Sequence, residues 1–285
     1  MRIAYAEHRY LSDDGLSLFY RMYGAATDRV PVVCLPGLTR NSRDFATIAG
    51  HLARRRLVIC PDLRGRGFSD RDRDHLHYVP ATYLRDITRL LGSLAIGRVI
   101  AIGTSLGGML TMMLAAADPK RIAAAVLNDI GPEVDPRGLE RIRRHTGKLP
   151  PVSSWEDAVA QARLMYGAAL PDLSDAQWHA FAARGYREDA HGVPKLDMDP
   201  KIGDALREVG GTVADPWPIW RAMGPIPALV LRGELSDVLS RETVRRMKRE
   251  KPDLLTLDVP NRGHVPLLDE PLVISAIDRF LDELP

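Results

Sequence analysis

Residues 99–110 read VIAIGTSLGGML and set a serine between two apolar segments. Residues 98–103 are apolar and rich in β-branched side chains without alternation, which is typical of a strand covered on both faces. Residues 109–117 are rich in helix formers. Ser105 therefore lies at a strand-to-helix junction, flanked by Gly103 and Gly107 in the spacing G-x-S-x-G. Such a turn exposes the serine hydroxyl as a nucleophile requires, although the spacing alone also fits a simple connection.

Strand-like and helix-like segments alternate on both sides of this junction. A hairpin is expected at 8–23, where apolar runs flank the turn residues SDDG. Strands are expected at 30–36, 56–62, 98–103, 121–129, 226–233 and 254–260, and helices at 42–55, 80–94, 109–117, 240–250 and 269–284. Ser42 is a suitable N-cap, and Pro80 suits the first turn of its helix. This alternation predicts an α/β fold with a mostly parallel, twisted sheet flanked by helices.

The alternation stops near Gly131 and resumes near Pro225. The stretch between them shows helical periodicity without clear strands and holds all four tryptophans. We therefore expect a first part of the core at 1–131, a helical cap insertion at 132–224 and a second part of the core at 225–285. Because ligands of open parallel sheets bind beyond the carboxyl ends of the strands, we expect the insertion to cover those ends.

The composition is that of an ordinary globular protein, with 285 residues, 45% hydrophobic and 27% charged, and a net charge of +2. Arginines are scattered, and the tightest cluster, RIRRH at 141–145, is expected to be a solvated helix face, so nucleic acid is not an expected partner. Cys34 and Cys60 lie in apolar runs without the spacing of a metal site. With no apparent signal peptide or membrane span, we expect a cytoplasmic protein without metal or cofactor, monomeric or homodimeric.

Three polar residues follow different predicted strands in the order serine, aspartate, histidine. Ser105 follows 98–103, Asp237 follows 226–233 and His264 follows 254–260. A neutral serine hydroxyl needs a base within hydrogen-bond reach, and the histidine in turn needs an acceptor for its other N–H. Asp237 is the favoured acceptor. Asp129, at the end of the strand 121–129, is the alternative.

The motifs LPGLTRNSRDF, PDLRGRGFSD, GTSLGG, LRGELSDVL and GHVPLLDEP, together with the N-terminal hairpin, span nearly the whole chain. With them the chain resembles the α/β-hydrolase fold superfamily, in particular capped serine hydrolases of the esterase and enol-lactonase kind. The resemblance implies that Ser105 is the nucleophile, Asp237 the acid and His264 the base.

The resemblance also implies an oxyanion hole made by the backbone N–H groups of Leu106 and Leu38. In the loop before Leu38 this chain has Pro36-Gly37, where many family members have His-Gly. The segment DLRGRGFSD is a structural turn in the family. Its arginines among glycines do not form a phosphate loop, because no Gly-Lys-Ser/Thr follows.

A serine nucleophile implies acyl transfer, so the expected activity is hydrolysis of a small carboxylic ester or lactone through an acyl-enzyme. One alternative is a carbon–carbon bond hydrolase of β-diketone-like ring-cleavage products. That group usually has tryptophan after the catalytic histidine, where this chain has Val265. Acyl transfer to another acceptor and a non-catalytic ligand-binding role are the remaining alternatives.

Residues expected to bind substrate come from the insertion and from the loop after the first parallel strand. Aromatic residues of the insertion either line the pocket or form the core of the cap; they are Trp155, Tyr166, Trp178, Phe181, Trp217 and Trp220. Arg40 and Asn41 either contact a substrate carboxylate or carbonyl, or cap the helix that begins near Ser42.

Overall fold

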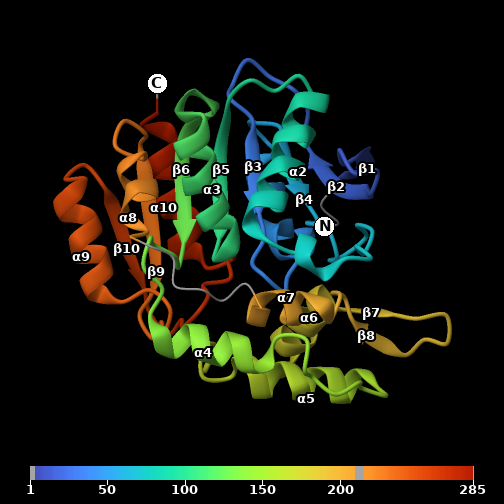
Figure 1. Cartoon of the computed structure of the whole chain (residues 1–285). Helices are drawn as coiled ribbons and strands as arrows, with labels where there is room; N and C mark the ends of the chain where they lie inside the picture. Colours follow the sequence, from blue (N-terminus) through green and yellow to red (C-terminus); the bar gives the residue numbers. More distant parts are fainter. Residues whose placement is uncertain (1–3, 209–214, 285) are drawn as a thin grey trace.

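The computed structural model describes residues 4–208 and 215–284, and a sheet of eight strands runs through its centre (Figure 1). The strand order is β1-β2-β4-β3-β5-β6-β9-β10. The bounds are β1 Ala6–Leu11, β2 Ser17–Tyr23, β3 Val32–Leu35, β4 Val58–Pro61, β5 Val99–Thr104, β6 Ile122–Asn128, β9 Ala228–Gly233 and β10 Leu255–Val259. The β1–β2 and β2–β4 pairs are antiparallel, and the remaining neighbouring pairs are parallel. The predicted α/β fold is confirmed.

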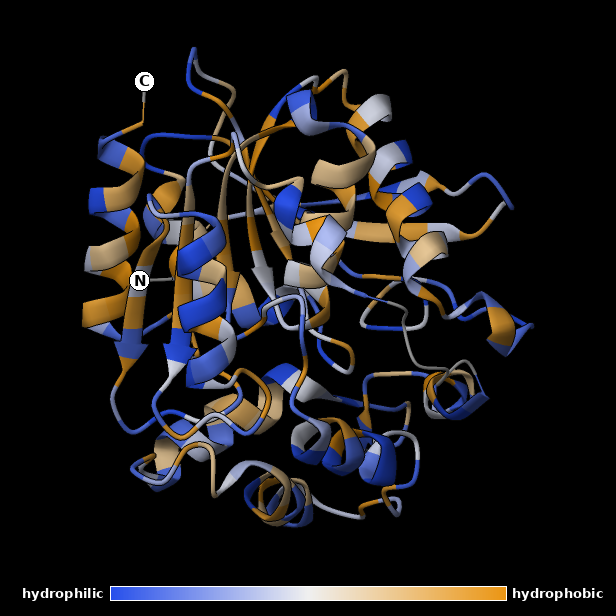
Figure 2. Cartoon of the chain, turned by 60° about the vertical axis from the view of Figure 1, so that its left-hand side comes forward, coloured by the Kyte–Doolittle hydropathy of each residue, from blue (hydrophilic) through white to orange (hydrophobic). Residues whose placement is uncertain are grey.

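Helices cover both faces of the sheet, and each buries an apolar side against it. One face is covered by α2 Pro80–Ser93, α3 Leu106–Ala117, α8 Trp217–Arg221 and α9 Arg241–Glu250, and the other by α1 Ala46–Leu52 and α10 Pro271–Asp282. Figure 2 shows the hydrophobic central strands and the hydrophilic outer sides of the flanking helices. The helix predicted at 42–55 begins as a 3₁₀ turn, Ser42–Phe45, and its N-cap is Asn41 instead of Ser42.

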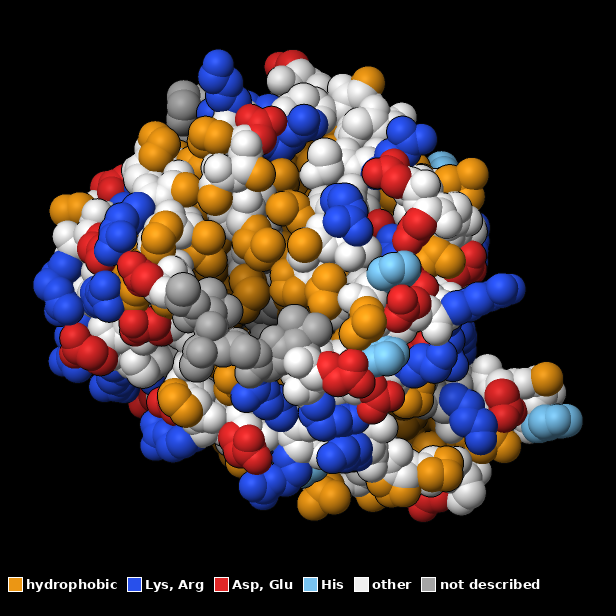
Figure 3. All heavy atoms as spheres, in the orientation of Figure 1, with side chains coloured by type: hydrophobic (Ala, Val, Ile, Leu, Met, Phe, Trp, Pro, Cys, Tyr) orange, Lys and Arg blue, Asp and Glu red, His pale blue; other side chains and the backbone are white. Residues whose placement is uncertain are grey.

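Residues 136–208, between β6 and α8, gather at the carboxyl ends of the strands (Figure 1). They contain α4 Pro136–His145, α5 Trp155–Tyr166, α6 Asp175–Gly185, β7 Tyr186–Glu188, β8 Pro194–Leu196 and α7 Lys201–Glu208. We call this segment the cap. The expectation that it has no strands is wrong, because β7 and β8 form a short antiparallel hairpin. Figure 3 shows Lys and Arg side chains gathered over α4.

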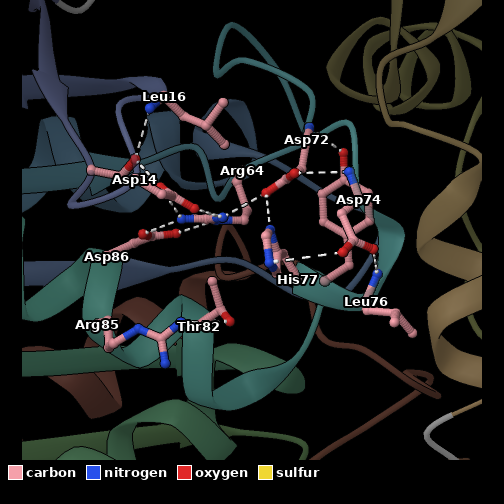
Figure 4. Close-up of polar contacts among 12 residues, drawn as sticks. Asp14, Leu16, Arg64, Asp72, Asp74, Leu76, His77, Thr82, Arg85 and Asp86 are labelled. Atoms are coloured by element: carbon pink, nitrogen blue, oxygen red, sulfur yellow. Dashed lines mark hydrogen bonds and ion pairs between the residues drawn. The ribbon is translucent and has the colours of Figure 1, made fainter.

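The segment DLRGRG after β4 forms an internal ion-pair cluster (Figure 4). The Arg64 guanidinium donates to Asp86 of α2, to Asp14 of the β1–β2 loop and to Asp72, with N–O distances of 2.7 Å for the shortest contact to each. The side chains of Arg64, Asp72 and Asp86 are 2%, 9% and 4% exposed. Arg64 therefore joins three separate segments, as expected for a structural turn.

Replacing Arg64 should destabilise the fold. Arg64→Met leaves the buried carboxylates of Asp72 and Asp86 without their cation, so the free energy of unfolding in urea should fall by about 3–5 kcal/mol. The control is Arg89→Met, since Arg89 is an exposed residue of α2 whose contact with Asp13 is 3.6 Å long. The control should change stability by less than about 1 kcal/mol. An Arg64→Met protein as stable as the control would contradict this interpretation.

Candidate active site

Ser105 lies on a tight turn between β5 and α3 and has a positive φ of 52°. Close backbone approach explains the glycines around it. A Cβ on Gly107 would lie 2.0 Å from the carbonyl oxygen of Leu35 on β3, and one on Gly103 would lie 2.4 Å from the carbonyl oxygen of Gly107. The turn thus requires side chains to be absent at both positions, which confirms the predicted sharp strand-to-helix turn.

The Gly107 contact gives a stability prediction. Gly107→Ala places a methyl group against the β3 backbone, so it should lower the free energy of unfolding by about 1–3 kcal/mol or more. Gly92 is a matched control because it lies in α2 and a Cβ there meets nothing within 4 Å. Gly92→Ala should be neutral or stabilising by up to about 1 kcal/mol. Equal thermal stability of the two variants would argue against the close-approach explanation.

His264 lies between Ser105 and a buried carboxylate. Its Nε2 is 2.9 Å from Ser105 Oγ, and its Nδ1 is 2.7 Å from Asp129 Oδ2. His264 is 8% exposed and Asp129 is completely buried. One ring nitrogen therefore faces the serine hydroxyl while the other is held by an acid, the arrangement that activates a serine.

Asp129 is positioned by the strand that precedes it and by the strand next to it. It follows β6, which pairs with β5 on one side and β9 on the other. Its carboxylate accepts hydrogen bonds from the Gly233 N–H at 2.8 Å and the Ser236 hydroxyl at 2.6 Å, besides the contact with His264. Three hydrogen-bond partners therefore satisfy this buried carboxylate.

The structure contradicts the prediction that Asp237 is the partner of His264. The Asp237 carboxylate points to α4 and forms two hydrogen bonds with Arg141, at 2.6 and 2.8 Å. Burial acts to raise the pKa of Asp237, but the hydrogen bond and charge of Arg141 outweigh it, so the pKa lies below its usual range. Ser236, one residue earlier, bonds to Asp129 instead. Both aspartates satisfy the order serine, aspartate, histidine, so the order alone does not distinguish them.

The two backbone amides expected to form an oxyanion hole lie near the serine. The Leu106 N–H is at the first position of α3. Leu38 follows the turn residue Gly37, and the Gly37 carbonyl accepts a hydrogen bond from the Arg40 N–H at 3.3 Å. Since the Gly37–Leu38 peptide is trans, the Leu38 N–H points away from that hydrogen bond. Arg66 Nε donates to the Leu38 carbonyl at 2.8 Å and fixes this loop. Within the described ranges, neither amide N–H has a hydrogen-bond partner.

A largely apolar cavity lies over Ser105 and His264 and is enclosed by the cap. Residues from the loop after β3, from α4 to α6 and from the loop after β10 line it. Its apolar lining includes Leu38, Ile142, Met165, Leu170, Phe181, Met198 and Leu267. The cavity offers a small organic molecule access to the serine hydroxyl.

Three of the eight predicted substrate-binding residues, Arg40, Tyr166 and Phe181, line this cavity. Arg40 is paired with Asp44, at 2.7 Å from Nε, and its guanidinium lies over the Phe181 ring at 4.4 Å. Tyr166 lies 3.5 Å from Thr39, oxygen to oxygen.

The other five do not line the cavity, and for Asn41, Trp155 and Trp178 the alternative role as a cap or as part of the cap core is the one found. Asn41 caps the 3₁₀ turn and donates to the Arg184 carbonyl at 3.0 Å. Trp178 packs in the core of the cap. Trp217 and Trp220 lie in the main core, and α8 packs on α3. Aromatic composition did not reveal which side of its helix each ring would occupy.

Sequence reasoning missed the contribution of α4 to the site. Arg141 and His145 line the cavity, although RIRRH was expected to be a solvated face. Arg144, in contrast, is an exposed residue of the same helix. The signal for this was the spacing of Arg141, Ile142 and His145, which places all three on one side of a helix.

A parallel sheet with a glycine-flanked serine after β5 and a histidine after β10 defines an α/β hydrolase. The model of the alpha/beta hydrolase family matches residues 32–277, and the chain belongs to this family. It is 46% identical to an alpha/beta hydrolase of solved structure from Novosphingobium aromaticivorans, with a TM-score of 0.94 over 99% of both chains.

Two curated relatives that match most of the chain are hydrolases by name. The chain is 31% identical to a 3-hydroxybutyrate-oligomer hydrolase from Cupriavidus necator, over 92% of this chain and 91% of the relative. It is 28% identical to a 2-(acetamidomethylene)succinate hydrolase from Mesorhizobium japonicum, over 86% of each chain. Among the described residues, no helix is long and apolar enough to cross a membrane.

Proposed function

We propose that this protein hydrolyses small carboxylic esters or lactones through an acyl-enzyme on Ser105. The observation that carries the proposal is the position of His264, which contacts Ser105 with one ring nitrogen and Asp129 with the other. This replaces Asp237 with Asp129 in the proposed triad.

In the proposed mechanism, Ser105 Oγ attacks the carbonyl carbon while His264 Nε2 takes the hydroxyl proton. Asp129 accepts from Nδ1–H, keeps the ring oriented and stabilises the imidazolium. The backbone N–H groups of Leu38 and Leu106 donate to the oxyanion. His264 then gives its proton to the leaving alcohol, and a water molecule activated by the same histidine releases the acid. These steps use side chains and backbone amides alone.

Similarity to named enzymes supports ester cleavage. The relative from Cupriavidus necator is named as a hydrolase of 3-hydroxybutyrate oligomers, and hydroxy-acid units in an oligomer are joined by ester bonds. A carbon–carbon hydrolase is the second candidate, since the chain is 28% identical over 155 residues to a 2-hydroxy-6-oxo-2,4-heptadienoate hydrolase. That match covers 54% of each chain, and Val265 follows His264 here, so we rank this candidate lower.

The first test is hydrolysis of p-nitrophenyl acetate, butyrate and octanoate by the wild type and by Ser105→Ala. Activity should vanish in the variant because no other group forms the acyl-enzyme, and only the wild type should be labelled by a fluorophosphonate. The acyl chain length that the wild type hydrolyses best then indicates the length of the acyl pocket. Turnover that survives in Ser105→Ala, or a folded wild type that is neither active nor labelled, would refute the proposal.

The identity of the acid gives a second test. Asp129→Asn should lower kcat by about 10²–10⁴-fold, because the amide no longer holds the histidine in its working tautomer. Asp237→Asn should lower kcat by less than about tenfold on the same neutral ester, since Asp237 makes no hydrogen bond to His264. Circular dichroism checks that both variants fold. A severe loss in Asp237→Asn with a mild one in Asp129→Asn would restore the prediction made from the sequence.

A further inference from the structure

The charged side chains that line the cavity are mainly cationic. Besides the two histidines, its charged lining residues are Arg40, Arg141, Arg184 and Asp44. The acids that pair with Arg141 and Arg184, namely Asp237 and Asp269, are not in the lining. A substrate inside the cavity therefore meets guanidinium groups more than carboxylates.

Arg40 and Arg141 differ in how far their hydrogen-bond donors are already used, and Arg184 donates to Asp269 through Nη2 at 3.1 Å. Arg40 is bound by Asp44 through two nitrogens, contacts the Phe181 carbonyl and covers the Phe181 ring. Arg141 is bound by Asp237 through Nε and Nη2 only. Among the described residues its Nη1 has no partner, so a guanidinium with five N–H donors keeps donors for a ligand.

The location of Arg141 suits recognition of a group remote from the scissile bond. Its side chain is 32% exposed and comes from α4 in the cap, whereas Ser105 comes from the core. Tyr166 of α5 lines the same cavity. His145, one turn along α4, bonds through Nδ1 to the Arg141 carbonyl and lines the same wall.

We propose that Arg141 binds a carboxylate carried by the substrate away from its scissile carbonyl, so that esters with a free carboxylate are preferred over neutral esters of equal length. The inference rests on the proposed ester hydrolysis. A guanidinium presents paired donors in the geometry of a carboxylate, and the apolar walls strengthen the interaction by excluding water. Asp237 orients Arg141 and competes with the substrate for it.

The test compares two p-nitrophenyl esters with six-carbon acyl groups. They are the hexanoate and the mono-ester of adipic acid, which ends in a carboxylate, and the readout is the ratio of their kcat/KM values. In the wild type the adipate ester should be preferred by about tenfold or more, as expected for a charge-assisted hydrogen bond. Suberate and octanoate extend the comparison to eight carbons.

Three variants separate binding from structure. Arg141→Gln should abolish the preference, and Arg141→Lys should keep part of it because the charge remains. Asp237→Asn should raise the preference, since the competing carboxylate is gone. A purely structural Arg141–Asp237 pair would instead give equal losses on both esters in all three variants. Arg144→Gln is the control on the same helix, because Arg144 is 69% exposed and outside the cavity.

Each outcome bears on a different claim. Hydrolysis of hexanoate without a preference for either acidic ester would overturn the carboxylate site and leave the proposed function intact. A preference that survives in Arg141→Gln would place the carboxylate on another residue and overturn the assignment. A folded wild type that hydrolyses none of the esters and resists fluorophosphonate labelling would refute the ester hydrolysis itself.

Discussion

The closeness of β3, β5 and the start of α3 is the constraint on which the site depends. The carbonyl of Leu35 lies where a Cβ of Gly107 would be, so α3 can begin directly against the sheet only because that side chain is absent. This places Ser105 at positive φ and sets Leu106 N at the helix start beside it. Ser105 is thus held by backbone packing more than by any contact of its own side chain.

The same sheet explains why Asp129 and not Asp237 reaches His264. β6 lies beside the serine-bearing strand β5, so a residue just after β6 begins close to Ser105. The turn after β9 then supplies donors to that carboxylate, the Gly233 N–H and the Ser236 hydroxyl. This turn stabilises the acid of the proposed triad without providing it.

The sequence predicted features that depend on neighbouring residues and failed for features that depend on residues distant along the chain. The strands of the main sheet, the helices that flank it and the Ser105 turn were predicted because hydrophobic periodicity and glycine spacing are local signals, whereas the short β7–β8 hairpin was missed. The sequence did not distinguish Asp129 from Asp237 as the partner of His264, because both residues follow strands. Which of them reaches His264 depends on the directions of the side chains in two neighbouring loops. The places of the tryptophans in the fold were not predicted for a similar reason. Trp217 and Trp220 lie in the predicted insertion, but α8 returns to the main core.

The contact between Asp237 and Arg141 of α4 is linked to the contact between Asp129 and His264. Because Asp129 occupies the position next to His264, Asp237 is free to turn outward, and it holds Arg141 with two hydrogen bonds. An aspartate bound to the histidine could not orient a cap arginine in the same way. With the proposed acid at the end of β6 and not in the loop after β9, the core can position a charged residue of the cap. In the proposed enzyme, the loop favoured from the sequence as catalytic acts on substrate selection instead.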